Sequence, residues 1–203
     1  MIAGRSGQRP FPLDASRRIP DSRDGGAENM VIVLNGGSSS GKSSIARCLQ
    51  ALLPVPWLTF GVDTLMAAMP AALWDSTAGI ALLAGGEIAV GPAVRHLYAT
   101  WVRGVAAMAQ DGTGLILDEV LLDGVEGQRQ WQVALAGVPV LWVGVRCDPA
   151  VGAAREAARG DRVAGMAASQ AQRVHRSVAY DLEVDTTQMS AVDCARIIAK
   201  RIG

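Results

Sequence analysis

The hydrophobic positions of this chain fall into short unbroken runs that alternate with longer stretches of helical spacing. Five runs are strand candidates, at 31–34, 57–62, 115–117, 140–145 and 182–184. Apolar spacing typical of helices occurs at 43–53, at 101–109, from 148 onward, at 165–175 and at 191–202. Strands without polar alternation are buried on both faces, and the helices between them act as crossovers. The pattern therefore predicts an α/β fold with a five-stranded parallel sheet flanked by helices.

Residues 1–29 lack this alternation. They contain five arginines and three prolines but few large apolar side chains. The segment has no apolar stretch of the kind found in a secretory signal, and its aspartates argue against a transit peptide. Such a composition buries too little surface to offset the entropy lost on ordering. We therefore predict a disordered leader over 1–29 and one folded domain over 30–203, for which Met30 is a suitable native start.

Charge and composition exclude several classes of partner. The 19 Lys and Arg residues balance the 19 Asp and Glu residues, so the chain offers no large basic surface for nucleic acid or an anionic membrane. A membrane span needs about 20 apolar residues, whereas the best candidate, 138–145, is interrupted by Pro139 and Gly144. The three cysteines lie far apart without a C-x-x-C pair, which indicates reduced thiols. We expect a cytoplasmic protein that binds neither nucleic acid nor membrane.

The first strand candidate runs directly into a loop of glycines and serines. Residues 36–43 read GGSSSGKS and match G-x-x-x-x-G-K-S/T, the phosphate-binding loop (P-loop), between a strand and a helix. Glycines let backbone N–H groups curl around an anion, and the positive end of the following helix adds to the attraction. The motif predicts that ATP is bound by Gly36, Gly37, Ser38, Ser39, Ser40, Gly41, Lys42, Ser43 and Ser44.

Two residues of this loop have further predicted roles. Lys42 supplies a cation to the β- and γ-phosphates, and we expect it to be an exposed residue of the loop. The Ser43 hydroxyl is a predicted Mg²⁺ ligand. Because Lys42 and Lys200 are the only lysines, the N-K-x-D element with which a GTPase reads guanine is absent. At 203 residues, the class that fits is a small-molecule or nucleotide kinase.

Acidic residues at strand ends are candidates for the remaining chemistry, because ligands of doubly wound sheets bind beyond the carboxyl ends of the strands. Asp63 follows the second strand candidate and is the predicted general base for the acceptor hydroxyl. It also fits the N-cap of a helix that begins at Thr64. Asp118 ends the third candidate and is the predicted second Mg²⁺ ligand, with a merely solvated acid as the alternative.

Three arginines surround a glycine further along the chain. Arg155, Arg159 and Arg162 are spaced by four and three residues around Gly160. A kinase without a partner subunit needs its own positive charge over the γ-phosphate. The cluster predicts a mobile, Arg-containing lid that supplies this charge. A solvated helix face with Arg–Glu pairs is the alternative.

From residue 30 to residue 203 the sequence resembles the chloramphenicol 3-O-phosphotransferase family. The matching segments are VLNGGSSSGKS (33–43), PWLTFGVDTL (56–65), VLWVGVRCD (140–148), ARGDRVAGMAASQ (158–170) and YDLEVDTT (180–187). The resemblance implies a P-loop kinase fold with a five-stranded parallel sheet and a lid, with Asp63 as the general base and lid arginines at Arg159 and Arg162. It also implies ATP- and Mg²⁺-dependent phosphorylation of the primary hydroxyl of chloramphenicol, which confers antibiotic resistance.

The match departs from the family in two places. Glu119 stands where the family has an aspartate, and residues 71–92 match least well. This segment follows Asp63, so it is a candidate lining of the acceptor pocket. The side chains of Met66, Met69, Leu73 and Trp74 fit either an aromatic acceptor or core packing.

Two other functions stay open at this point. One is a kinase of the same fold that acts on another small alcohol, such as a sugar acid, a shikimate-like metabolite or a nucleotide. The other is an ATP-binding regulatory protein without transfer activity, against which the presence of Asp63 and the arginine cluster argues.

Deletion of residues 1–29 is expected to leave both melting temperature and activity unchanged, because their composition favours disorder. Thermal melts and turnover of the full chain and of the chain beginning at Met30 check this expectation. A loss of several degrees would show that the leader packs on the domain.

Overall fold

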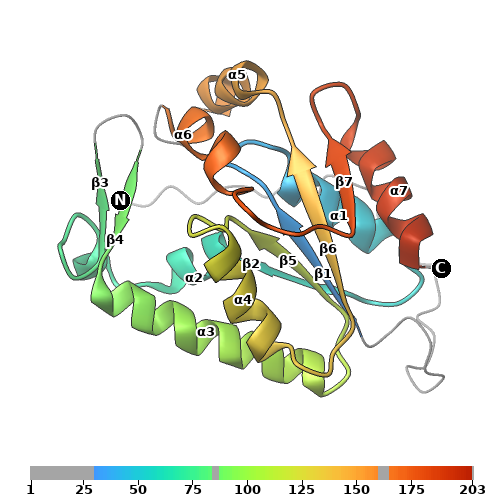
Figure 1. The fold of residues 1–203 in the computed structure, drawn as a ribbon, viewed down its shortest axis with the longest axis horizontal. Coiled ribbons are helices and arrows are strands. Elements are labelled where there is room, and N and C mark those ends of the chain that lie inside the picture. The colour runs from blue at the N-terminus through green and yellow to red at the C-terminus, as the bar shows by residue number, and fades with distance from the viewer. Residues whose placement is uncertain (1–29, 84–86, 160–164, 203) are drawn as a thin grey trace, which may run out of the picture.

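The computed structural model describes residues 30–83, 87–159 and 165–202 (Figure 1). The predicted leader and the predicted lid residues Gly160 and Arg162 lie outside these ranges.

A parallel sheet of five strands forms the centre of the fold, in the order β2-β5-β1-β6-β7. The strands are β1 (Val31–Asn35), β2 (Leu58–Gly61), β5 (Leu115–Glu119), β6 (Val140–Arg146) and β7 (Leu182–Asp185). Each strand pairs in parallel with its neighbours, so the predicted five-stranded parallel sheet is confirmed. All five strand candidates of the sequence correspond to strands of this sheet.

Helices cover both faces of the sheet. Helices α1 (Lys42–Leu52) and α7 (Ala191–Ile202) pack on one face, and α3 (Pro92–Gln110) and α4 (Val125–Ala134) pack on the other. Successive residues of a strand point to opposite faces. In β1, Ile32 and Leu34 therefore join the α1/α7 cluster, whereas Val31 and Val33 join the α3/α4 cluster. Burial on both faces explains why β1 shows no polar alternation.

The segment between β2 and β5 differs most from the sequence prediction. It contains α2 (Val62–Ala68), a 3₁₀ turn (Ala71–Leu73), and an antiparallel hairpin of β3 (Ile80–Leu82) and β4 (Ile88–Val90). The hairpin was not predicted, because strands of three residues leave almost no periodic signal. Helix α3 begins at Pro92 rather than near Trp101. A proline in the first turn was an available start signal.

This segment has its own small apolar cluster, built around Met69, Ile80 and Val94. Met66 and Leu73 pack against the cluster, so both serve the core-packing role that the sequence left open. Trp74 is 45% exposed and does not join it.

Two further findings bear on the class of protein. None of the helices within the described ranges is long and apolar enough to cross a membrane. All three cysteines are free thiols, as their spacing predicted.

Candidate active site

The P-loop leaves β1 at Gly36 and closes at the first turn of α1. Two of its residues have positive φ, Ser39 at 58° and Gly41 at 93°, which turns the chain back toward the helix. At Gly36 a Cβ atom would lie 2.6 Å from Val145 O and 2.7 Å from Ser40 Oγ. Only glycine fits there, because the loop approaches β6 so closely.

Three consecutive serine hydroxyls, of Ser38, Ser39 and Ser40, are buried and have no hydrogen-bond partner among the described residues. Buried hydroxyl groups are nearly always hydrogen-bonded. A phosphate group, with its several acceptor oxygens, is the kind of ligand that such a run of donors accommodates. The loop therefore suits the phosphates of a nucleotide, the ligand that its sequence motif predicts.

Lys42 is the first residue of α1, and its side chain is only 6% exposed. Its Nζ donates to Gly36 O at 2.9 Å and to Gly37 O at 3.0 Å. The expectation of an exposed cation was wrong, because the loop folds over the ammonium group. Asp118 Oδ1 lies 3.6 Å from the same nitrogen, so the cation is held between loop carbonyls and an acid.

The two predicted Mg²⁺ ligands meet at this point. Ser43 Oγ donates to Asp118 Oδ2 at 2.5 Å, and the parallel register sets Asp118 opposite Leu34 on the neighbouring strand. No group of three or more His, Cys, Asp or Glu side chains that could hold a metal occurs in the described part of the chain. One carboxylate and one hydroxyl suit Mg²⁺, which is commonly held by one or two protein ligands plus substrate phosphates and water.

Asp63 lies near the same edge of the sheet. Helix α2 begins at Val62 with Gly61 as its N-cap residue, so Asp63 lies in the first turn and is not the cap that the sequence also allowed. Gly61 pairs with Asp118, and a Cβ atom at Gly61 would lie 2.3 Å from Asp118 O. Asp63 is exposed and follows this close contact by two residues. The base candidate therefore follows the strand that pairs with β5, which carries the metal candidate Asp118.

Glu119 points away from this group. It is 1% exposed on the α3/α4 side, where Tyr98 Oη donates to its Oε2 at 2.8 Å and Trp131 Nε1 donates to Tyr98 Oη at 3.0 Å. Burial raises the pKa of Glu119 to about 7, opposed by the hydrogen bond from Tyr98. An acceptor hydroxyl cannot reach so enclosed a carboxyl, which leaves Asp63 as the exposed candidate for the base.

The two described arginines of the predicted lid, Arg155 and Arg159, have different surroundings. Arg155 of α5 (Pro149–Arg159) donates to Thr186 O at 2.7 Å and to Thr186 Oγ1 at 3.1 Å. It therefore joins α5 to the loop after β7 and has a structural role. Arg159 lies exposed at the end of α5. Arg162 is outside the described residues.

A cleft of about 460 Å³ lies beside the P-loop. It is lined by Ser39 and Ser44 of the loop region, by Arg155 and Arg159 of α5, and by Thr186 and residues 189–191. These lining residues after β7 were not predicted as part of the site, although the strand-end rule that selected Asp63 and Asp118 applies equally to the end of β7.

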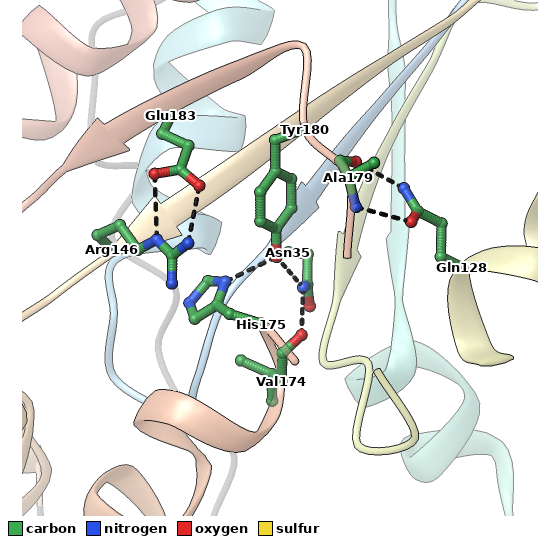
Figure 2. Close-up of polar contacts among 8 residues, drawn as sticks. All are labelled: Asn35, Gln128, Arg146, Val174, His175, Ala179, Tyr180 and Glu183. Carbon is green, nitrogen blue, oxygen red and sulfur yellow. Dashed lines mark hydrogen bonds and ion pairs between the residues drawn. The ribbon is translucent and has the colours of Figure 1, made fainter. Parts of the chain in front are cut away.

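Behind the loop, a buried polar network ties α6 (Met166–Arg173) and the following turn to the sheet (Figure 2). Asn35, the last residue of β1, donates from Nδ2 to Val174 O at 2.7 Å and to Tyr180 Oη at 2.6 Å. Its Oδ1 accepts from Leu121 N at 3.0 Å. A single fully buried amide thus joins the start of the P-loop to three other segments, and no local sequence pattern indicated it.

His175 lies at the edge of this network, with Nδ1 at 2.6 Å from Tyr180 Oη (Figure 2). Burial, together with the charge of Arg146, lowers the pKa of His175 to about 4. The Arg146 guanidinium pairs with Glu183 at 2.7 Å. His175 is therefore a neutral histidine with a structural role.

Comparison with known proteins supports the family resemblance. Residues 29–203 match the sequence model of the family described as "Chloramphenicol phosphotransferase-like protein". The chain is also similar to a Mycobacterium tuberculosis (strain H37Rv) protein named "Putative O-phosphotransferase". The two are 31% identical over 185 residues, which cover 83% of this chain and 80% of the relative.

Solved structures show the same fold at low sequence identity. A sugar kinase from Janibacter sp. is 15% identical with a TM-score of 0.63, and covers 85% of this chain and 93% of its own. A shikimate kinase from Acinetobacter baumannii is also 15% identical, with a TM-score of 0.58 over 86% of this chain and 94% of its own. These likenesses identify the fold as that of the P-loop kinases.

The pKa of His175 leads to a test of the network. The unfolded chain takes up this proton near the ordinary pKa of 6.5, whereas the folded protein resists protonation down to about pH 4. Between these values the unfolded state binds more protons, so the free energy of unfolding falls as the pH decreases. His175→Gln lacks this titration. Its melting temperature should therefore approach or exceed that of the wild type as the pH is lowered from about 7 to about 4.5.

His96→Gln, at an exposed position of α3, is the matched control. A constant difference in melting temperature between the wild type and His175→Gln across this pH range would contradict the assignment.

Proposed function

The chain belongs to the chloramphenicol phosphotransferase-like family, and on that premise we propose that it is an ATP-dependent O-phosphotransferase acting on a hydroxyl of a small molecule in the cytoplasm. The observation that carries the proposal is the meeting of Lys42, Ser43 and Asp118 beneath the P-loop, with Asp63 near the same sheet edge. Family membership and this geometry support the same reaction class.

The loop and α1 bind the phosphates of ATP. Backbone N–H groups of the loop, apart from those of Gly36 and Ser38 that bond to other segments, surround the anion together with the three buried serine hydroxyls and the Lys42 ammonium. The base and ribose occupy the cleft between α5 and the residues after β7, Thr186 and 189–191. Ser43 and Asp118 hold Mg²⁺, which when bound neutralises negative charge on the phosphates.

Asp63 orients the acceptor and takes up the proton of its hydroxyl. The acceptor oxygen then forms a bond to the terminal phosphorus, and the bond from that phosphorus to the ADP oxygen breaks. Arg159 and Arg162 supply positive charge to the transferred group. Glu119 is too enclosed to substitute for Asp63.

The acceptor is the primary hydroxyl of chloramphenicol, which makes the reaction one of antibiotic inactivation. The family resemblance supports this choice, and the exposed Trp74 offers an aromatic surface beyond α2. The second candidate is another small alcohol, such as a sugar acid, a shikimate-like metabolite or a nucleotide. It is favoured by the divergence of residues 71–92, a stretch that includes strands β3 and β4.

An ADP-release assay with purified protein tests this function. Chloramphenicol should stimulate ADP release, its 3-deoxy analogue should not, and the product should carry phosphate on the primary hydroxyl. Lys42→Ala supplies the background rate, because it removes the cation that reaches the β- and γ-phosphates. Stimulation of ADP release by a metabolic alcohol but not by chloramphenicol would show that the acceptor is the second candidate, another small alcohol. The absence of release with every acceptor would refute the transferase.

Asp63→Asn separates catalysis from structure. Asp63 is exposed and is not the N-cap, so the change should alter stability by no more than about 0.5 kcal/mol. Asparagine does not take up the acceptor proton, so kcat should fall by roughly 10²-fold or more. ATP affinity should stay near that of the wild type, because the loop and the metal ligands are intact.

The matched control is Asp111→Asn, an exposed aspartate at the end of α3. Turnover, nucleotide titration and melts are measured on the same preparations. Near-normal turnover of Asp63→Asn would exclude Asp63 as the base.

A further inference from the structure

One peptide group of the P-loop is held from both sides. Its carbonyl, Gly37 O, accepts from Lys42 Nζ at 3.0 Å and more weakly from Ser40 N at 3.3 Å, and its N–H, that of Ser38, donates to Gln170 Oε1 at 2.8 Å. The C=O and N–H of a trans peptide point in opposite directions. Lys42 and Gln170 therefore act on opposite edges of the same rigid plane, and the orientation of the carbonyl that binds Lys42 depends on Gln170.

Gln170 is well placed to fix this plane. Its side chain is 4% exposed, and it comes from α6, which the proposed reaction does not otherwise use. At the start of α6, the buried carboxylate of Glu156 accepts the N–H groups of Gly165 at 2.8 Å and Ala167 at 2.6 Å. These bonds anchor the first turn of the helix to α5.

The other end of α6 is anchored to the sheet. Val174 O accepts from Asn35 Nδ2 at 2.7 Å, and Asn35 directly precedes the P-loop (Figure 2). With both ends of α6 fixed, the Gln170 carboxamide is positioned before any ligand arrives. Such pre-positioning is what a precise binding site requires.

The glycine at position 37 makes an external restraint necessary. Glycine adopts both signs of φ at little cost, so the Gly37–Ser38 peptide has no intrinsic preference for one orientation. A Cβ atom at Gly37 would lie 3.4 Å from Gln170 Cβ and from Ala171 N, which shows that α6 packs directly on this residue. The hydrogen bond to Gln170 selects one orientation of the peptide.

We propose that Gln170 is a positioning residue for Lys42. By holding the Ser38 N–H, it turns Gly37 O toward the ammonium and keeps Lys42 at the end of the loop that receives the terminal phosphate. The lysine of a P-loop reaches the β- and γ-phosphates, so the consequence is preferential binding of ATP over ADP. The preference for ATP over ADP rests on the proposed function, whereas the positioning of Lys42 by Gln170 does not.

The chain offers a direct probe of this control, because Lys42 and Lys200 are its only lysines. Native protein without nucleotide is treated with a limiting amount of an acetylating reagent, and the two lysine peptides are quantified by mass spectrometry. Lys200 is exposed on α7 and serves as the internal reference. The measured quantity is the ratio of Lys42 to Lys200 acetylation.

Gln170→Met keeps the length of the side chain but removes the acceptor oxygen. The acetylation ratio should rise roughly two- to tenfold, the range expected from the loss of about one hydrogen bond. Gln170→Glu retains an acceptor and should stay close to the wild-type ratio. Gln172→Met, at an exposed position of the same helix, is the control for a methionine on α6.

An unchanged ratio in folded Gln170→Met would overturn the proposal. Should that variant fail to fold, Gln170→Asn decides in its place, because its amide is one methylene too short to reach Ser38. ATP and ADP titrations of the same variants give a second readout, in which Gln170→Met should weaken ATP binding more than ADP binding. The wild type could also bind no nucleotide while the acetylation ratio still differs between the wild type and Gln170→Met. In that case the proposed function fails and the positioning role of Gln170 stands.

Discussion

Parallel pairing of β1 with β5 is the constraint on which the whole site depends. The register sets Leu34 opposite Asp118, so the loop that leaves one strand meets the acid that ends the other. Ser43 and Lys42, in the first turn of α1, then lie within reach of the Asp118 carboxylate. A shift of one residue would turn Asp118 to the α3/α4 face. It would also bring Glu119, whose pKa is raised by burial, to the loop side.

Around this centre, remote side chains hold the P-loop from outside. Asn35 fixes its start, Gln170 binds the Ser38 N–H, and Thr186 Oγ1 donates to Ser40 O at 2.8 Å. Arg155 in turn holds Thr186. Phosphoryl transfer is mostly a matter of positioning and charge stabilisation, with little covalent chemistry for the protein to perform. A loop restrained from several elements suits that task.

The segment between β2 and α3, which we propose lines the acceptor site, has a different construction. It packs with the start of α3 in a separate apolar cluster, and it leaves the sheet directly after the close contact of Gly61 with Asp118. Helix α6 also links this segment to the sheet. Its Arg173 donates to Leu122 O, after β5, at 3.0 Å and pairs with Glu87, which directly precedes β4, at 3.3 Å. Helix α6 therefore contacts both the P-loop and the segment between β2 and α3. A part of the chain with its own core can diverge while the phosphate site is preserved.

The sequence alone determined the sheet, the P-loop and the acids at the strand ends. Each is a local signal, since an apolar run, an eight-residue motif or an acid after a strand is read within a few positions. Tertiary structure decided that Lys42 is buried, that Asp63 is not a cap, that Glu119 turns away, and that Arg155 is structural. It also supplied Asn35 and Gln170, whose bonds to Val174 and Ser38 join residues 139 and 132 positions apart. No local pattern encodes such bonds, because they exist only once the sheet has brought the two segments together.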